Sequence, residues 1–342
     1  MSPRFPTPCV LSVVCVALTA GCFPGVSNQV EHANVAFDVS PDGKNVCFSS
    51  AGGDLFLLDL DTLKVRRLTN TSTKETRPVF SPDNESIVYA ADTEDSKGTF
   101  IFARSIDGDR VKQLTRDPDV SDSLPRYSPD GAQIVFARAH RHRPYSMGGW
   151  TWDDWDVYVM DAGGGNLRRV TQKKHYGINK VLFSRDGQSV IYSAETDRGS
   201  SDSVVSVFEA SVDGAASPTS VTSRPKSAGK HYAWASDPGL SADGRYFVFI
   251  SDRDAPYHYD LVLMDRQNGN SRSLATTQIS RYNQHPVFTP DGKRILFLAG
   301  TEWNASSRPI FSLWSVDTDG KNAKQIATSG LFTGPLNWSP NP

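Results

Sequence analysis

The 342 residues, of which 38% are hydrophobic and 22% charged, suffice for one large domain or two ordinary ones with a sizeable core. The formal net charge is −2, so the composition provides no bulk electrostatic basis for binding nucleic acid or an anionic membrane surface. The 26 glycines and 21 prolines are scattered along the chain, which indicates many turns rather than disorder.

The chain begins with a segment typical of a secretory signal peptide. Its apolar run, Val10–Leu18, is too short to span a membrane as a mature helix, and small residues follow it. The sequence LTAGC, which ends at Cys22, resembles the bacterial lipoprotein signal, although Leu18 stands one position earlier than the usual aliphatic residue. We therefore expect a signal peptide at 1–21, lipidation of Cys22 and a tether at 22–32, with cleavage alone as the alternative.

A motif of the form SPDGK recurs six times and predicts the organisation of the chain. It first stands at residues 40–44 and returns as SPDNE, SPDGA, SRDGQ, SADGR and TPDGK, at intervals of roughly 41 to 57 residues, near or above the spacing of propeller blades. Every copy keeps one aspartate, which we expect to cap a tight turn rather than to bind a ligand. These aspartates are Asp42, Asp83, Asp130, Asp186, Asp243 and Asp291.

The predicted elements follow the same order in each copy. One strand precedes the motif, an alternating strand such as SIVYAA or QIVFAR follows it, a third such as DVYVMDA comes after a variable loop, and a fourth ends near RRLT or KQLT. Helical periodicity is nearly absent, so each unit is predicted to be a four-stranded antiparallel meander. Six such units predict an all-β, six-bladed β-propeller over residues 33–342, and PLNWSPNP predicts an extra C-terminal strand that closes the ring or caps the last blade.

These units resemble the repeats of the TolB-type β-propeller family, in which SPDGK-like turns, a third strand of the form (D/L)-x-Y-x-M-D and a terminal LT recur. The resemblance covers about residues 33–342. It implies a periplasmic interaction platform at the bacterial cell envelope. That family usually carries an additional α/β domain before the propeller, whereas only about ten residues separate Cys22 from the first predicted strand. We therefore expect the propeller alone.

Six of the seven histidines are predicted on one face of the ring, which we call the loop face. This face carries the loops between second and third strands and the connections between blades. The histidines are His140, His142, His175, His231, His258 and His285, and the aromatic residues predicted beside them include Trp150, Trp152, Trp155, Tyr232, Trp234 and Tyr282. The stretch 141–155, RHRPYSMGGWTWDDW, is the longest loop predicted on this face. We expect the face to bind a partner, with packing onto a neighbouring blade as the alternative for any single tryptophan.

A second group of candidate residues opens the first strand of each blade and is expected to approach the central channel. In chain order they are Ala36, Arg77, Leu124, Lys180, Asp237 and His285. Arg77 and Lys180 could hold an anion such as a carboxylate. Alternatively, they pair with Asp237 or with neighbouring acids.

Two enzyme classes are weighed against binding alone. The sequence has no G-x-S-x-G motif and no attached α/β domain, which argues against a serine peptidase of the prolyl-oligopeptidase type. Oligogalacturonate lyases, which have a similar propeller, hold a divalent metal with histidine and glutamine. Here His175, His231, Gln284 and His285 lie in three successive connections, and surface or hydrogen-bonded histidines are the other interpretation.

We therefore expect an exported, lipid-anchored propeller on the periplasmic side of the bacterial envelope, with no catalytic activity, no cofactor and no metal. Its expected partner is an envelope protein, a peptide or an oligosaccharide, and Phe23 after the cysteine favours the outer membrane. The alternative function is a metal-dependent, oligogalacturonate-lyase-like enzyme acting on uronate oligosaccharides.

Overall fold

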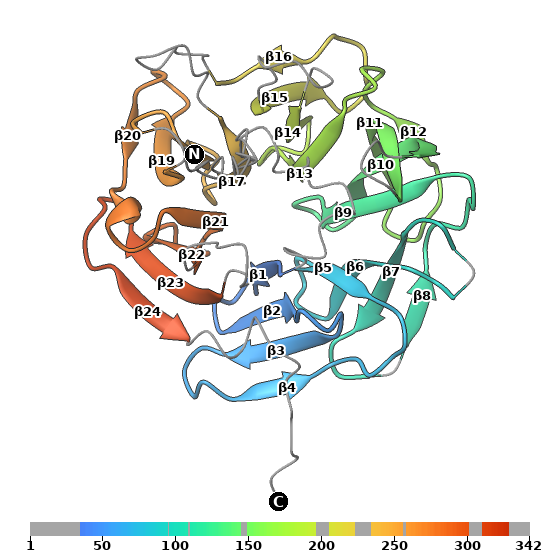
Figure 1. Ribbon diagram of the computed structural model, residues 1–342, viewed down its shortest axis with the longest axis horizontal. Coiled ribbons are helices and arrows are strands. Elements are labelled where there is room, and N and C mark those ends of the chain that lie inside the picture. Colours follow the sequence, from blue (N-terminus) through green and yellow to red (C-terminus); the bar gives the residue numbers. More distant parts are fainter. Residues whose placement is uncertain are drawn as a thin grey trace, which may run out of the picture.

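The computed structural model describes residues 35–94, 96–108, 110–144, 149–195, 205–222, 234–255, 258–300 and 310–327. These residues form a ring of six blades, and each blade is a four-stranded antiparallel sheet (Figure 1). The predicted six-bladed β-propeller is therefore confirmed. The signal peptide, the tether and the extra C-terminal strand lie outside the described residues.

Each blade uses four consecutive strands in sequence order, with the first strand innermost and the fourth at the rim (Figure 1). Blades 1 to 3 contain β1 (Phe37–Val39), β2 (Asn45–Ser49), β3 (Leu55–Asp59), β4 (Val65–Arg67); β5 (Glu75–Phe80), β6 (Ser86–Ala91), β7 (Phe100–Ser105), β8 (Val111–Gln113); and β9 (Ser121–Tyr127), β10 (Gln133–Pro144), β11 (Trp150–Asp161), β12 (Arg168–Arg169). Blades 4 to 6 contain β13 (Gly177–Phe183), β14 (Ser189–Glu195), β15 (Val205–Ser211), β16 (Thr219–Ser220); β17 (Ser236–Leu240), β18 (Tyr246–Ser251), β19 (Asp260–Asp265), β20 (Ser271–Ser273); and β21 (Tyr282–Phe288), β22 (Arg294–Gly300), β23 (Phe311–Asp317), β24 (Lys324–Ala327). A short 3₁₀ helix, η1 (Thr276–Gln278), precedes blade 6.

The six SPDG-type turns share one hydrogen-bond pattern. In blade 1 the hydroxyl of Ser40 donates to Asp42 at 2.6 Å, and the same carboxylate oxygen accepts from the amide of Lys44 at 3.1 Å. The other five turns repeat both bonds. Gly43 follows with φ of 73°, a conformation that glycine adopts without steric cost. The six aspartates therefore cap the turns, as their position in the motif predicts.

Adjacent turns also touch each other. An ideal Cβ on Gly131 would lie 3.6 Å from Cδ of Pro82 in the preceding blade, and one on Gly43 would lie 3.5 Å from Cδ of Pro290. These are ordinary van der Waals distances, so the proline of one turn packs against the glycine of the next. The first of these two contacts joins blades 2 and 3, and the second joins blades 6 and 1.

A β-bulge interrupts the pairing of the first and second strands in blades 2 to 6. Four bulge residues have positive φ values of 50° to 61° and precede a proline: Arg77, Leu124, Asp237 and His285. A bulge changes the direction in which a side chain points. Here it falls on the innermost strands (Figure 1), and five of the six residues predicted at the channel line the cavity at the axis: Ala36, Arg77, Leu124, Lys180 and His285.

The hydrophobic cores lie between neighbouring blades. Phe48 and Leu58 of blade 1 belong to one buried cluster with Leu298 and Leu313 of blade 6. Apolar packing of this kind stabilises in proportion to the area removed from water, so this cluster contributes to closing the ring. No helix among the described residues is long and apolar enough to cross a membrane.

Candidate functional site

The inner strands enclose a cavity of about 40 Å³ at the axis of the propeller. Its lining includes three basic side chains, Arg77 from β5, Arg126 from β9 and Lys180 from β13, together with His285 from β21. Arg77 is only 9% exposed. Two carboxylates, Asp38 and Asp237, neighbour these cations.

The carboxylates at the axis balance only part of this positive charge. Arg126 pairs with Asp38 at 3.2 Å. Asp237 accepts from the backbone amide of His285 at 3.3 Å, and Lys180 donates to the carbonyl oxygen of Pro286 at 3.2 Å. At neutral pH the described residues therefore place three cations against two carboxylates.

Burial also shifts the pKa values at the axis. It lowers the pKa of Lys180 to about 8, although Asp237 opposes the shift, so that the lysine is still largely protonated at neutral pH. Burial lowers the pKa of His285 to about 4, which leaves that imidazole uncharged. Acids thus neutralise part of the cluster, as the pairing alternative predicted, and one positive charge remains in excess among the described residues.

The hairpin β10–β11 carries the tryptophan-rich stretch. Trp152 and Trp155 are buried, with exposures of 4% and 3%. The Trp152 indole donates to the carbonyl oxygen of Lys97 in blade 2 at 2.9 Å. This placement differs from the exposed aromatic surface expected from the sequence. Trp152 thus anchors the hairpin on blade 2, and Trp155 packs in the core between blades 3 and 4, which was the alternative interpretation.

Trp150 remains on the surface of the hairpin, where it is 62% exposed. Its ring stacks on His142 with centroids 4.9 Å apart, and His142 also contacts Trp152. The neighbouring Arg143 donates to the buried carboxylate of Asp153 at 2.6 Å. Of the three tryptophans of this stretch, only Trp150 is exposed enough to contact a ligand.

The remaining predicted histidines do not form a common site among the described residues. His140 and His175 each hydrogen-bond a tyrosine hydroxyl, at 3.1 Å to Tyr158 and 3.2 Å to Tyr192. The partly buried Trp234, His258 and Tyr282 lie in or beside blades 5 and 6, while His231 and Tyr232 lie outside the described residues. The described part of the chain contains no group of three His, Cys, Asp or Glu side chains arranged to hold a metal ion.

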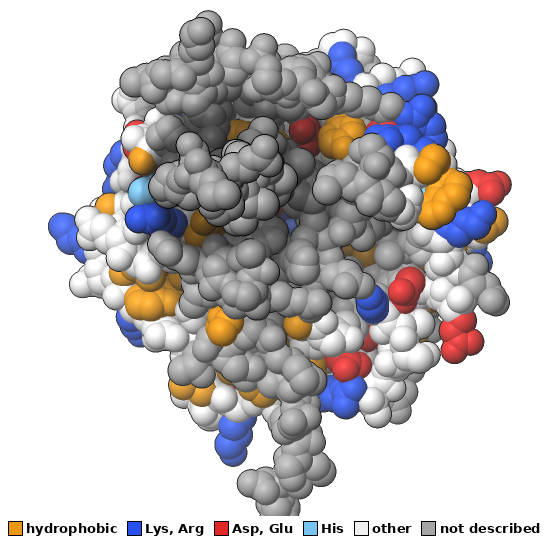
Figure 2. Space-filling view, viewed as in Figure 1, with side chains coloured by type: hydrophobic (Ala, Val, Ile, Leu, Met, Phe, Trp, Pro, Cys, Tyr) orange, Lys and Arg blue, Asp and Glu red, His pale blue; other side chains and the backbone are white. Residues whose placement is uncertain are grey.

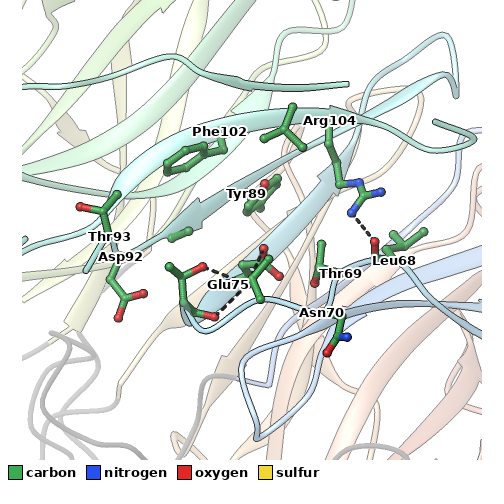
Figure 3. Close-up of a pocket in the computed structure, with 13 residues that line it drawn as sticks. Leu68, Thr69, Asn70, Glu75, Tyr89, Asp92, Thr93, Phe102 and Arg104 are labelled. Carbon is green, nitrogen blue, oxygen red and sulfur yellow. Dashed lines mark hydrogen bonds between the residues drawn. The ribbon is translucent and has the colours of Figure 1, made fainter. Parts of the chain in front are cut away.

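A larger pocket, of about 430 Å³, lies between blades 1 and 2, and the sequence analysis did not find it (Figure 3). Glu75, Tyr89, Phe102 and Arg104 line it. The face shown in Figure 2 has hydrophobic, basic and acidic side chains scattered over its described part without one dominant patch. Surface composition alone therefore does not locate a site.

A family model described as the TolB beta propeller domain matches residues 12–148 and 146–341. The Tol-Pal system protein TolB of Francisella tularensis subsp. tularensis (strain WY96-3418) is 24% identical over 277 residues, which are 80% of this chain and 56% of that protein. The uncharacterized peptidase YuxL of Bacillus subtilis (strain 168) is 27% identical over 188 residues, 54% of this chain and 23% of that protein. The chain thus spans about half, or less, of the length of these relatives.

Solved structures share the fold at low sequence identity. TolB from Acinetobacter baumannii superposes with a TM-score of 0.61 at 18% identity, covering 87% of this chain and 64% of that one. An oligogalacturonate lyase in complex with manganese gives a TM-score of 0.53 at 18% identity, covering 86% and 77%. At such identities the likeness shows a common architecture, and fold alone does not set function.

Proposed function

This chain belongs to the TolB beta propeller domain family, and on that premise we propose that it is an envelope protein that binds a protein or peptide partner over its axial cavity. The supporting observation is the excess positive charge in that cavity. Arg77 is buried and is attracted by the charge of Asp237, but its guanidinium makes no hydrogen bond to another described residue. A carboxylate from a partner, either an acidic side chain or a C-terminus, would supply the missing acceptor.

The loop face around the cavity would provide the rest of the contact surface. Trp150 is the exposed aromatic residue among the described members of the predicted set, and aromatic residues are enriched among those that dominate binding energy. Rigid loops on a propeller are suited to this role because the scaffold holds them in place. The relatives named for the Tol-Pal system are consistent with a protein partner in the envelope.

The test begins with crosslinking of the purified mature protein in an envelope extract and identification of the captured partner. Dissociation constants are then measured for that partner with the wild type, Arg77→Met, Lys180→Met and the control Arg66→Met. Arg66 is an exposed arginine at the rim, paired with Asp107. We expect the two axial variants to bind at least about tenfold more weakly. Unchanged affinity of both would contradict an axial carboxylate site.

Lipid anchoring of Cys22 belongs to the same proposal and is tested separately. Labelled palmitate should enter the wild type and not Cys22→Ser, and only the wild type should partition with membranes. A Cys22→Ser protein that still partitions with membranes, together with an unlabelled wild type, would contradict the anchor. Outer-membrane location is then read from fractionation of the two membranes.

The lyase alternative is examined in the same preparations. Uronate oligomers are incubated with the protein, with and without EDTA and added Mn²⁺, and unsaturated product is followed by ultraviolet absorbance. We expect no product under either condition. Metal-dependent formation of unsaturated product would contradict the binding proposal and support the lyase function.

A further inference from the structure

Blades 2 and 3 contain the same structural unit with one component exchanged. In blade 3, Asp122 on β9 pairs in register with Arg138 on β10. In blade 2, the equivalent pair is Glu75 on β5 and Ala91 on β6. The acidic side chain is therefore kept in both blades, whereas the arginine is present only in blade 3.

In blade 3 the arginine fills its site completely. Its Nε and Nη2 atoms donate to the two oxygens of Asp122 at 2.6 and 2.8 Å. Its guanidinium carbon also lies 5.5 Å from the ring centroid of Phe136 and 5.1 Å from that of Tyr158, within cation–π range. Asp122 and Arg138 are both buried, so each depends on the other for its charge balance.

Blade 2 retains every part of this arrangement except the cation. Tyr89 and Phe102 pair across the strands as Phe136 and Tyr158 do, and their rings stack with centroids 5.8 Å apart. Glu75 is only 3% exposed. Its Oε1 accepts from the hydroxyl of Thr71 at 3.2 Å, but its Oε2 is buried without a hydrogen-bond partner.

The space next to this carboxylate is open. Ala91 lines the pocket of about 430 Å³. Glu75, Tyr89 and Phe102 line it as well (Figure 3). Asp92 adds a second carboxylate to the lining, and Arg104 is the one cation among the described lining residues. Arg104 is directed to backbone carbonyls, those of Leu68 and Gly108, and Figure 3 shows it turned toward Leu68.

From this comparison we propose that the pocket between blades 1 and 2 binds a guanidinium group supplied by a ligand, held by Glu75 and the rings of Tyr89 and Phe102. The ligand takes the place that Arg138 occupies in blade 3. A buried carboxylate with one unsatisfied oxygen costs free energy, and a planar cation with several N–H donors satisfies that oxygen better than a neutral group does. Burial raises the pKa of Glu75, as it also raises that of Asp122 in blade 3, so the missing cation is inferred from the geometry.

Two sources could present this group, a free guanidinium compound or an arginine side chain of a peptide. The shared chemistry is tested with agmatine and with N-acetyl-arginine amide, and the neutral isostere N-acetyl-citrulline amide serves as the control ligand. Binding is measured by calorimetry with the full chain. We expect both guanidinium compounds to bind saturably and the citrulline compound not to bind. Tighter binding of an arginine-containing peptide than of agmatine would indicate the peptide source, and equal or weaker binding the small molecule.

Two variants test the residues that carry the proposal. Glu75→Gln keeps the shape of the side chain and removes its charge, and should weaken binding about tenfold or more. Ala91→Arg supplies the missing cation from within the chain, and should abolish binding because the introduced side chain occupies the site. Glu85→Gln, an exposed glutamate of the same blade, is the matched control and should bind as the wild type does.

The proposal is overturned if neither guanidinium compound binds the wild type saturably, or if Glu75→Gln binds both with unchanged affinity. Should Ala91→Arg fail to fold, the Glu75→Gln result still decides. The inference does not depend on the axial site, because the two sites share no lining residue. Arg77→Met should therefore bind the guanidinium compounds normally, which separates failure of this proposal from failure of the proposed function.

Discussion

The backbones of Trp155 and His175 exchange two hydrogen bonds, each 2.9 Å long. This bridge joins β11 in blade 3 to the connection that leads into blade 4. Both side chains are buried, and the imidazole of His175 contacts the hydroxyl of Tyr192 in blade 4. Two residues expected from the sequence to meet a ligand thus join neighbouring blades instead.

Replacing the two hairpin tryptophans, Trp152 and Trp150, should change the stability of the protein by different amounts. Trp152→Ala removes a buried ring and its hydrogen bond to Lys97, and should lower the free energy of unfolding by about 3 kcal/mol. Trp150→Ala removes an exposed ring and should change it by less than about 0.5 kcal/mol. Urea unfolding of the two variants measures the difference. Equal losses would mean that the hairpin is not anchored through Trp152.

Two buried histidines should make the protein sensitive to acid. Burial lowers the pKa of His175 and of His285 from 6.5 to about 4. Between these pH values the unfolded chain binds protons that the folded chain does not, so stability falls as the pH drops, by up to about 1.4 kcal/mol per pH unit for each residue. His175→Gln and His285→Gln should each flatten this dependence in denaturation curves recorded across the window. A slope unchanged in both variants would contradict the burial of neutral imidazoles.

Lys180 should reduce stability at neutral pH and lose this effect in base. Its folded-state pKa is lowered from 10.5 to about 8 by burial, so between these values the unfolded chain holds the extra proton. The free energy of unfolding contributed by this group therefore rises as the pH increases from about 8 to 10.5. Lys180→Met should be more stable than the wild type at neutral pH, and the difference should shrink through this range. A less stable variant at neutral pH would show that its bond to Pro286 outweighs the cost of burial.

The turn aspartates should matter for stability and not for binding. In blade 2 the hydroxyl of Ser81 and the amide of Glu85 donate to Asp83 and hold the pKa of its carboxyl below the usual value. Asp83→Ala should destabilise the protein by about 1 kcal/mol, the scale of a lost turn hydrogen bond. The contribution is present at neutral pH and is lost as the pH falls through the lowered folded-state pKa.

Asp83→Asn, which retains an acceptor oxygen, is the control and should lose less stability than Asp83→Ala. Chemical denaturation measures both, and affinity for the captured partner is compared at temperatures where each variant is folded. Weaker partner binding by fully folded Asp83→Ala would place a binding surface on the side of the turns.

The architecture was predictable because the same turn motif and strand pattern occur six times, and each copy independently predicts one four-stranded blade. The positions of Arg77 and Lys180 at the axis were predicted for the same reason, since both stand four residues before their turn motif. The burial of Trp152 was not predictable, because alternation along a strand does not reveal which neighbour a long hairpin folds onto. That depends on contacts between blades.

The pocket at Glu75 could have been suspected from a difference between two repeats, which the study of one motif at a time does not reveal. The strands SIVYAA and QIVFAR differ at their last residue, Ala91 in one and Arg138 in the other, while both blades keep an acid six residues before the turn. An alignment of the repeats with one another would have shown that the acid of blade 2 lacks the arginine that stands opposite the acid of blade 3. The open volume itself could be found only once the blades were packed.

The contact between the proline of one SPDG turn and the glycine of the next has a consequence for how such a chain can originate. It is a head-to-tail contact, found between blades 2 and 3 and between blades 6 and 1, and the turns of blades 1, 3 and 6 carry both the proline and the glycine. A duplicated gene segment that encodes a blade with both residues therefore supplies both halves of this contact to its neighbours. The ring can thus grow by copying until its curvature closes, and individual blades are afterwards free to diverge, as the exchange of an arginine for an alanine between two of them illustrates.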